Sequence, residues 1–196
     1  MDAVEKNAAG RVDSCQAEIH FFKDREKEMS ILTDLKATGE MPLRVTHNDT
    51  KFNNILLDDE TDEALSVIDL DTVMPGIVTD DFGDAIRFAA NTADEDETDL
   101  SKVEVSLELF EAFTKGFLTA LDGRLTETEM KNLAWGAKII TMEIGARFLA
   151  DYINGDVYFK IHKENHNLDR ARCQIALAKS IEDKFDELNK IVEKYM

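Results

Sequence analysis

A polar loop followed by an apolar hairpin limits the fold of this chain more than any other feature. The loop reads HNDTKFNN over residues 47–54, and the segment VIDLD follows at 67–71. Between them, the apolar runs 55–57 and 64–68 flank a polar connection of hairpin length. Because a hairpin returns the chain to its starting point, we expect Asp69 to lie beside the loop.

The residue types in this segment suit the transfer of a phosphoryl group. Asp49 and Asn54 are five residues apart, which lets one loop turn the carboxylate toward an acceptor hydroxyl and return the amide toward a metal ion. Lys51 can donate to the migrating phosphate. Asp69, at the end of an apolar strand, can bridge Mg²⁺ to a triphosphate. The pattern therefore predicts a site for ATP and Mg²⁺.

The spacing H-x-D-x-x-x-x-N, followed by a strand and an Ile-Asp pair, resembles the C-terminal lobe of the aminoglycoside-phosphotransferase and choline-kinase-like family, relatives of protein kinases. The resemblance implies that Asp49 is the catalytic base and that Asn54 and Asp69 are Mg²⁺ ligands, with Asp71 as an auxiliary ligand. It implies that His47 braces the loop without taking part in the chemistry. It also implies that an acid of the next helix anchors the loop, and we assign that role to Asp84.

Three longer segments narrow the resemblance to the N-acetylhexosamine 1-kinase branch, whose members phosphorylate the anomeric hydroxyl of an N-acetylhexosamine. They are THNDTK at 46–51, VIDLDTVMPG at 67–76 and RFLADYINGDVYF at 147–159. In that branch an Arg and a Tyr eleven residues apart contact the sugar, and Arg147 and Tyr158 match that spacing. From their residue types alone, the same two side chains could equally be a surface Arg and a Tyr at the edge of the core.

Apolar periodicity outside the loop and hairpin predicts helices. We expect helices over 11–36, ending at Gly39, and over 101–121, 126–153 and 168–195, with a capping box at Thr126 and an extended segment at 41–46. The acidic run 93–99 lacks the Gly and Glu of a calcium loop, so we expect a solvated loop there. The predicted fold class is α+β, mostly α: a protein-kinase-like C-terminal lobe with a small β-hairpin beside the catalytic loop.

We expect one domain over residues 1–196, with the catalytic loop at 46–54, the hairpin at 55–69 and a helical remainder at 84–196. Members of the family also have an N-terminal lobe that covers the nucleotide. Only 46 residues precede His47, and they read as helix, with Gly10 and Gly39 as their only glycines. We therefore expect that this nucleotide-clamping lobe is absent and that the chain is a fragment, inactive alone.

The composition argues against several classes of partner. Acidic residues outnumber basic residues by 41 to 23, giving a formal net charge of −18, which opposes binding to nucleic acid or to an anionic membrane. Cys15 and Cys173 are far apart, which fits a reducing compartment and gives no zinc pattern. The N-terminal residues lack the design of a secretion signal. We expect a cytoplasmic enzyme with a small-molecule substrate.

Two other functions stay open at this stage. The segment VIDLDTV at 67–73 resembles the D-x-D-x-T nucleophile loop of haloacid-dehalogenase-like phosphatases, in which Asp69 would be phosphorylated and Asp71 would act as acid and base. That fold requires alternating strands and helices, whereas the residues after Val73 read as helical. The other alternative is a non-catalytic module that uses the same lobe to dock a partner.

Overall fold

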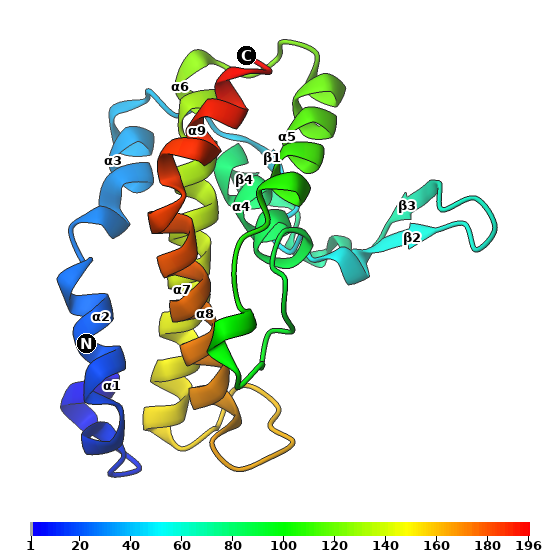
Figure 1. The fold of residues 1–196 in the computed structure, drawn as a ribbon. Coiled ribbons are helices and arrows are strands. Elements are labelled where there is room, and N and C mark those ends of the chain that lie inside the picture. The colour runs from blue at the N-terminus through cyan, green and yellow to red at the C-terminus, as the bar shows by residue number, and fades with distance from the viewer. Residues whose placement is uncertain (1) are drawn as a thin grey trace.

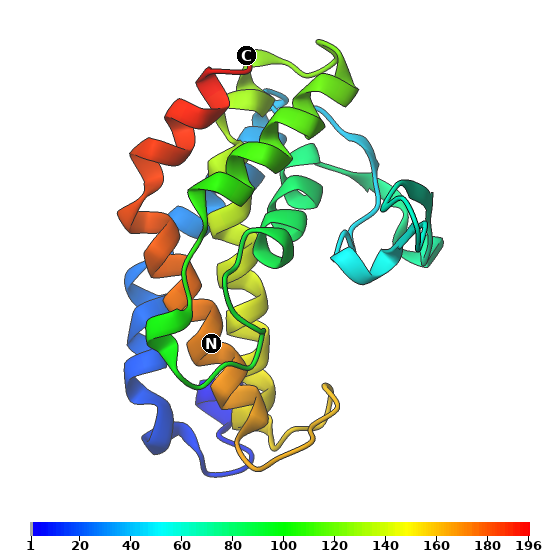
Figure 2. The same cartoon turned by 45° about the vertical axis from the view of Figure 1, so that its right-hand side comes forward.

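The computed structural model describes residues 2–196 as a helical body with two small antiparallel sheets (Figures 1 and 2). The α-helices are α1 (Asp2–Lys6), α2 (Gln16–Asp24), α3 (Ile31–Thr38), α4 (Val78–Ala89), α5 (Leu107–Leu121), α6 (Glu127–Lys131), α7 (Leu133–Asn154), α8 (His166–Asp183) and α9 (Phe185–Glu193). The strands are β1 (Arg44–Thr46), β2 (Ile55–Leu57), β3 (Ala64–Val67) and β4 (Met74–Gly76). Short 3₁₀ helices are η1 (Val12–Cys15), η2 (Glu28–Ser30), η3 (Phe52–Asn54), η4 (Leu70–Thr72) and η5 (Leu100–Lys102). A mostly helical α+β fold is therefore confirmed.

The long helices α7 and α8 run side by side through the middle of the body, with α1 to α3 along one side and α4 and α5 along another (Figure 1). The largest apolar cluster is centred on Phe82 of α4, whose ring meets Phe110 of α5 edge-on at 5.7 Å between centroids. A second cluster joins Ile19 of α2 to Leu149 of α7 and Leu168 of α8. Burial of these apolar faces stabilises the helical body.

The two sheets lie at one side of this body, and the β2–β3 hairpin projects away from it (Figures 1 and 2). β2 pairs with β3 in the antiparallel register Ile55↔Val67, so the predicted hairpin is confirmed. β4, which periodicity did not predict, pairs with β1 in the register Arg44↔Gly76. Gly76 allows this pairing because a Cβ there would overlap the Thr46 hydroxyl.

The helix predicted over 11–36 is wrong as a single element, because the chain leaves helical geometry after Asp24. Arg25 closes α2 with φ −106° and ψ 5°. Its guanidinium donates to both carboxylate oxygens of Glu182 in α8, at 2.6 and 2.8 Å, and lies 3.8 Å from the centre of the Phe21 ring. These contacts with α8 outweigh the local helical tendency. As predicted, α3 ends at Gly39, which has φ 80°.

The later helices are shorter than predicted because of breaks that periodicity does not detect. α5 begins at Leu107, where the Ser106 hydroxyl accepts from the Leu109 amide, and not near residue 101. The capping box of Thr126 and Glu129 is confirmed, but Asn132 separates α6 from α7. Lys184 separates α8 from α9. Its ammonium donates hydrogen bonds to the Glu104 carboxylate and to the Val105 carbonyl.

Two glycines let the backbones of α4 and α7 come into direct contact. A Cβ on Gly83 would overlap the carbonyl group of Gly136, and a Cβ on Gly136 would overlap the Thr79 carbonyl. Both helices have buried faces here, so neither backbone can move aside without disturbing the core. This contact sets how closely the N-terminal turn of α4 approaches the rest of the body.

We predict that Gly136→Ala destabilises the fold by about 1–3 kcal/mol, the usual cost of overpacking a closed contact. Gly116 in α5 is the matched control, because nothing lies within 4 Å of a Cβ placed there. Gly116→Ala should be neutral or should stabilise by up to about 1 kcal/mol through helix propensity. Urea unfolding of both variants measures the effects, and equal stabilities would contradict the close contact.

Candidate active site

The loop 46–54 is anchored to the body by one carboxylate of α4. Asp81 accepts the backbone N–H of His47 on Oδ2 and that of Asn48 on Oδ1, both at 2.8 Å. The Thr50 hydroxyl donates to the Asp81 carbonyl at 2.7 Å. Asp81 lies in the first turn of α4, where the helix dipole favours a negative charge. The loop is therefore positioned by a carboxylate on a helix whose other face is buried.

This anchoring differs from the expectation for Asp84. The Asp84 carboxylate pairs with Arg87 at 3.0 Å and reaches the loop only at the Thr50 hydroxyl, 3.5 Å away. Asp84 lies one helical turn beyond Asp81, so it lies farther along α4 from the loop backbone. The structure corrects the assignment: Asp81 bonds the loop backbone, and Asp84 holds Arg87.

Two residues of the site have left-handed backbone conformations that non-glycine residues rarely adopt. Asn48 has φ 62°, and Asp69 has φ 61° and ψ 57°. Such conformations cost about 1–3 kcal/mol each and cluster at functional sites. The Asn48 amide donates to the Thr72 carbonyl at 2.9 Å, and the Thr72 hydroxyl donates to the His47 carbonyl at 2.7 Å. These bonds hold the loop to the segment that follows Asp69.

The side chains of Asp49, Lys51 and Asn54 meet within the loop. Oδ2 of Asp49 accepts from Nζ of Lys51 at 2.8 Å and from Nδ2 of Asn54 at 3.0 Å. Nδ2 of Asn54 also donates to the Asp49 carbonyl at 2.8 Å, so both bonds of this amide use its nitrogen. Among the residues that the structure describes, no donor bonds the Asn54 amide oxygen, which leaves it available to a cation.

Asp49 is held in its ionised form. Burial raises the pKa of its carboxyl, but the hydrogen bonds from Lys51 and Asn54 and the Lys51 charge outweigh burial, so the pKa lies below its ordinary value. Asp49 is only half-buried and one of its oxygens carries both bonds. The arrangement can therefore present a carboxylate oxygen to an acceptor hydroxyl at neutral pH.

The end of the hairpin returns to the loop, as the sequence predicts. Nε2 of His47 lies 2.9 Å from the Ile68 carbonyl, and the Ile68 N–H donates to the Asn54 carbonyl at 2.9 Å. Asp69 follows directly. His47 thus contacts the backbone directly before Asp69, and its bracing role stays a prediction.

Asp69 and Asp71 form a close pair of carboxyl groups. A hydrogen bond to Asp71 and repulsion from its charge raise the pKa of Asp69 above its ordinary value, and the Lys51 charge opposes this rise. Two exposed carboxylates that repel each other gain stability when a cation binds between them. The structure therefore places the three predicted metal ligands, Asn54, Asp69 and Asp71, around one end of the hairpin.

This donor set fits Mg²⁺ bound mainly through a nucleotide. Within residues 2–196 no group of three or more His, Cys, Asp or Glu side chains could hold a metal ion by itself. Mg²⁺ commonly takes one or two protein carboxylates and completes its shell with water and phosphate oxygens. An amide oxygen and two carboxylates beside an open face meet this requirement.

Next to Asp49 lies a hollow of about 580 Å³, which we call the acceptor pocket. It is lined by residues of the loop, α4, α7 and the segment after α7: Asn48, Asp49, Lys51, Thr72, Asp84, Arg87, Phe88, Glu95, Ile144, Arg147, Phe148, Tyr158, Phe159, Lys160, His162 and Arg170. The two predicted sugar contacts, Arg147 and Tyr158, line it together, and the Arg147 guanidinium lies 5.9 Å from the centre of the Tyr158 ring. Asp49 and these two residues therefore share one hollow.

The segment after α7 is fixed by Asp151, a buried acid that sequence reasoning missed. Its Oδ1 accepts the N–H groups of Val157 and Tyr158, at 3.0 and 2.9 Å, and its Oδ2 accepts that of Phe159 at 2.9 Å. Asn167 of α8 adds a hydrogen bond to Oδ2 at 2.9 Å. Three consecutive amides on one carboxylate fix the backbone that carries Tyr158.

Two acids of the run 93–99, expected to be solvated, contact buried side chains of the helical body. Glu95 binds Arg87 at 2.6 Å and lines the acceptor pocket, and Asp96 bonds Nε2 of the buried His166 at 2.9 Å. The prediction missed these partners because Arg87 and His166 come from α4 and α8. This run forms part of the pocket wall.

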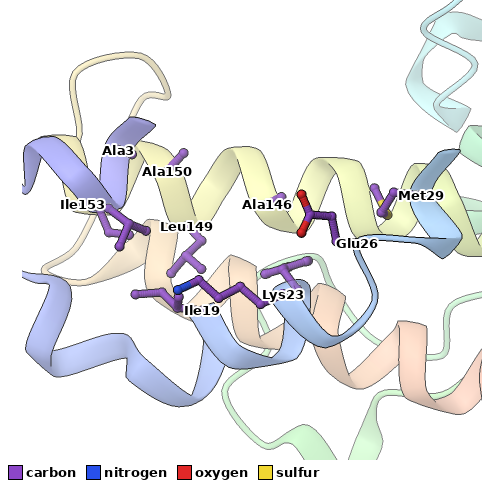
Figure 3. Close-up of a pocket in the computed structure, with 11 residues that line it drawn as sticks. Ala3, Ile19, Lys23, Glu26, Met29, Ala146, Leu149, Ala150 and Ile153 are labelled. Carbon is purple, nitrogen blue, oxygen red and sulfur yellow. The ribbon is translucent and has the colours of Figure 1, made fainter. Parts of the chain in front are cut away.

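A second hollow, of about 330 Å³, lies between α1, α2 and α7 (Figure 3). Its walls are mainly apolar and include Ile19, Leu149 and Ile153, with Lys23 and Glu26 as its charged residues. None of the predicted site residues lines it. It carries no group suited to phosphoryl transfer, so the acceptor pocket is the candidate active site.

Helix hydropathy and a comparison with known protein families give two further findings. Within residues 2–196 no helix is long and apolar enough to cross a membrane. The family model described as APH, phosphotransferase enzyme family, matches residues 2–113, which include the loop, the hairpin and α4.

We predict opposite effects for two neighbouring acids of α4. Burial, with the nearby charges of Glu143 and Asp81, raises the pKa of Asp80 to about 6. As the pH falls from 7 to 4, folded Asp80 takes up a proton before unfolded Asp80 does, so the wild type gains stability relative to Asp80→Asn. Asp80→Asn should stabilise the fold at pH 7 by about 1 kcal/mol, because the half-buried group is partly screened, and this gain should vanish by pH 4.

Asp81→Asn should instead destabilise the fold by about 1–3 kcal/mol, because one of the two loop amides loses its acceptor. Thermal unfolding between pH 4 and pH 7 measures both variants. A gain from Asp80→Asn that does not depend on pH would contradict the raised pKa, and a neutral Asp81→Asn would contradict the anchoring of the loop.

Proposed function

The chain belongs to the phosphotransferase enzyme family, and on that basis we propose that it transfers the γ-phosphoryl group of ATP to a hydroxyl of a small sugar. The single observation that carries the proposal is the meeting of Asp49, Lys51 and Asn54 beside Asp69 and Asp71, at the mouth of a hollow that can hold an acceptor. The resemblance of 147–159 to the N-acetylhexosamine 1-kinase branch points to the anomeric hydroxyl of an N-acetylhexosamine.

In the proposed reaction the acceptor oxygen forms a bond to the γ-phosphorus while the bond from that phosphorus to the ADP oxygen breaks. Asp49 orients the acceptor hydroxyl and receives its proton. Its lowered pKa suits a carboxylate that takes the proton late, as the new bond forms. Lys51 donates to Oδ2 of Asp49, so the acceptor hydroxyl would take the other carboxylate oxygen, and the Lys51 ammonium beside it would also contact the phosphate oxygens.

Asn54, Asp69 and Asp71 would hold Mg²⁺. When bound, the ion neutralises charge on the phosphates. The free amide oxygen of Asn54 and the repulsion between Asp69 and Asp71 support this role. His47 and Asp81 keep these ligands in place through the backbone. Arg147 and Tyr158 would contact the sugar in the acceptor pocket.

Apolar side chains exposed around the hairpin support a further part of the proposal. Val45 of β1 is 84% exposed, and Leu65 and Val67 of β3 are also exposed. Val45 lies on the strand that leads into the loop, and Leu65 and Val67 lie on the strand that precedes Asp69. We propose that a nucleotide-covering lobe, as expected from the family resemblance, packs on this surface.

The haloacid-dehalogenase-like alternative finds no support in the fold. Its nucleophile requires a parallel sheet with helices on both faces. Within residues 2–196 both sheets are two-stranded and antiparallel. After β4 the chain forms α4 to α9, with only the isolated bridge between Asn91 and Val105 as further strand pairing.

Removal of the Asp49 carboxylate tests the proposed chemistry. In the longest reading frame that contains this chain, Asp49→Asn should lower sugar-dependent ADP release from Mg-ATP by ~10²–10⁴-fold, the usual contribution of a positioned base. The control is Asp59→Asn at the exposed tip of the hairpin, which should leave the rate unchanged. The assay should cover N-acetylhexosamines, free hexosamines, choline and aminoglycosides.

A loss of less than threefold for Asp49→Asn would contradict its role as the base. Sugar-independent release of phosphate, without transfer to any acceptor, would contradict the assignment as a phosphotransferase. Thermal unfolding of both variants shows whether the fold is retained.

A further inference from the structure

We infer that the acceptor pocket is built for a sugar that carries a carboxylate, in preference to a neutral or an amino sugar. The inference rests on the proposed transfer of a phosphoryl group to a sugar hydroxyl. It replaces the neutral N-acetylhexosamine suggested by the resemblance with an acidic sugar as the preferred acceptor. It comes from the charges in the pocket, which are opposite in sign to those of the chain as a whole.

The chain carries a formal net charge of −18, yet five cationic side chains and only three acids line the acceptor pocket. The three acids already have cationic partners. Asp49 pairs with Lys51 at 2.8 Å, and Asp84 and Glu95 both pair with Arg87, at 3.0 and 2.6 Å, while Glu95 lies 4.0 Å from Nε of Arg170. The remaining cations are Arg147, Lys160 and Arg170, so the pocket holds positive charge that its own acids leave largely uncompensated.

Arg147 and Lys160 have no side-chain hydrogen bond or ion pair to any described residue. Arg147 is exposed on α7, with its guanidinium 5.9 Å from the centre of the Tyr158 ring and 5.7 Å from that of Phe159. The two aromatic rings contact the Arg147 side chain but do not neutralise its charge. Lys160 follows Phe159 directly, so its ammonium can reach the same hollow.

Arg170 of α8 provides the most specific signal. Its Nε is buried without a hydrogen-bond partner, and the closest carboxylate oxygen, on Glu95, is 4.0 Å away. Its Nη1 donates to the Lys160 carbonyl and to Oδ1 of Asn167, both at 3.2 Å. A buried guanidinium N–H that lacks an acceptor is costly, so the Arg170 charge in the pocket wall is only partly compensated by the protein.

A carboxylate balances the positive charge of Arg147, Lys160 and Arg170 better than a neutral group does. The carbonyl of an N-acetyl group can accept from the same donors, but it leaves the excess positive charge uncompensated. Charge-assisted hydrogen bonds from guanidinium and ammonium groups to a carboxylate are about twice as strong as neutral ones. An ammonium or a quaternary amine on the acceptor would be repelled by Arg147, Lys160 and Arg170.

Binding of matched sugars to the 196-residue chain tests the inference without requiring turnover. Glucuronic acid and glucuronamide have the same shape and differ in charge, and glucosamine adds a positive charge. By isothermal titration at low ionic strength, glucuronic acid should bind about tenfold more tightly than glucuronamide, with glucosamine weakest. Added salt should reduce the difference.

Arg147 and Lys160 are exposed, so substitutions there should keep the fold, whereas Arg170 is largely buried. Arg147→Gln and Lys160→Gln should each reduce the preference for the acid at least threefold, and Arg170→Lys, which keeps the charge but removes the buried Nε, should also reduce it. Lys115→Gln on α5 removes one positive charge from an exposed side chain outside the pocket and should leave the preference unchanged.

Equal binding of glucuronic acid and glucuronamide, no binding of either, or an unchanged preference in the pocket variants would overturn the inference. Phosphotransfer assays with Mg-ATP keep the two proposals separate. Transfer to neutral and acidic sugars at equal efficiency would overturn the inference and leave the proposed function intact. Preferred binding of the acid with no transfer to any sugar would contradict the proposed function and leave the inference intact.

Discussion

The candidate site depends on one carboxylate that accepts two backbone amides. Asp81 fixes the N–H groups of His47 and Asn48, and with them the left-handed turn at Asn48 from which Asp49 projects. An ionised acceptor in the first turn of a helix is well suited to this task, because the helix dipole stabilises the charge that the amides require. The anchored loop also contacts the end of the hairpin, because Nε2 of His47 is hydrogen-bonded to the Ile68 carbonyl. The same chain of contacts therefore positions the proposed base and the proposed metal ligands.

The helical body holds this anchor in place. α4 packs against α7 through close contacts at Gly83 and Gly136. These contacts fix the distance between the N-terminal turn of α4 and α7. α7 in turn provides Arg147 and, through Asp151, fixes the segment that carries Tyr158. The loop on one side of the pocket and Tyr158 on the other are therefore both held by α4 and α7. A rigid scaffold of this kind preserves the geometry that phosphoryl transfer requires.

Local patterns in the sequence predicted the loop, the hairpin and the capping box at Thr126, because spacing, alternation and capping are properties of neighbouring residues. The helix breaks at Arg25 and Lys184 were not predictable, since each depends on a partner distant in sequence, Glu182 or Glu104. The choice of Asp81 over Asp84 as the anchor depends on how α4 is rotated relative to the loop. Three acids within five residues gave no means to decide it. Arg170 was missed because it lies between the apolar positions of α8, and only packing brings it to the pocket.

In the proposed site the loop and the hairpin place Asn54, Asp69 and Asp71 around one divalent ion. Paramagnetic relaxation by Mn²⁺, a substitute for Mg²⁺, tests this claim directly in the ¹⁵N-labelled chain with ATP present. The account predicts that the amide signals of these three residues broaden at the lowest Mn²⁺ concentrations, before those of the acidic run 93–99. Broadening confined to the acidic run, with sharp signals from Asn54 and Asp69, would contradict it.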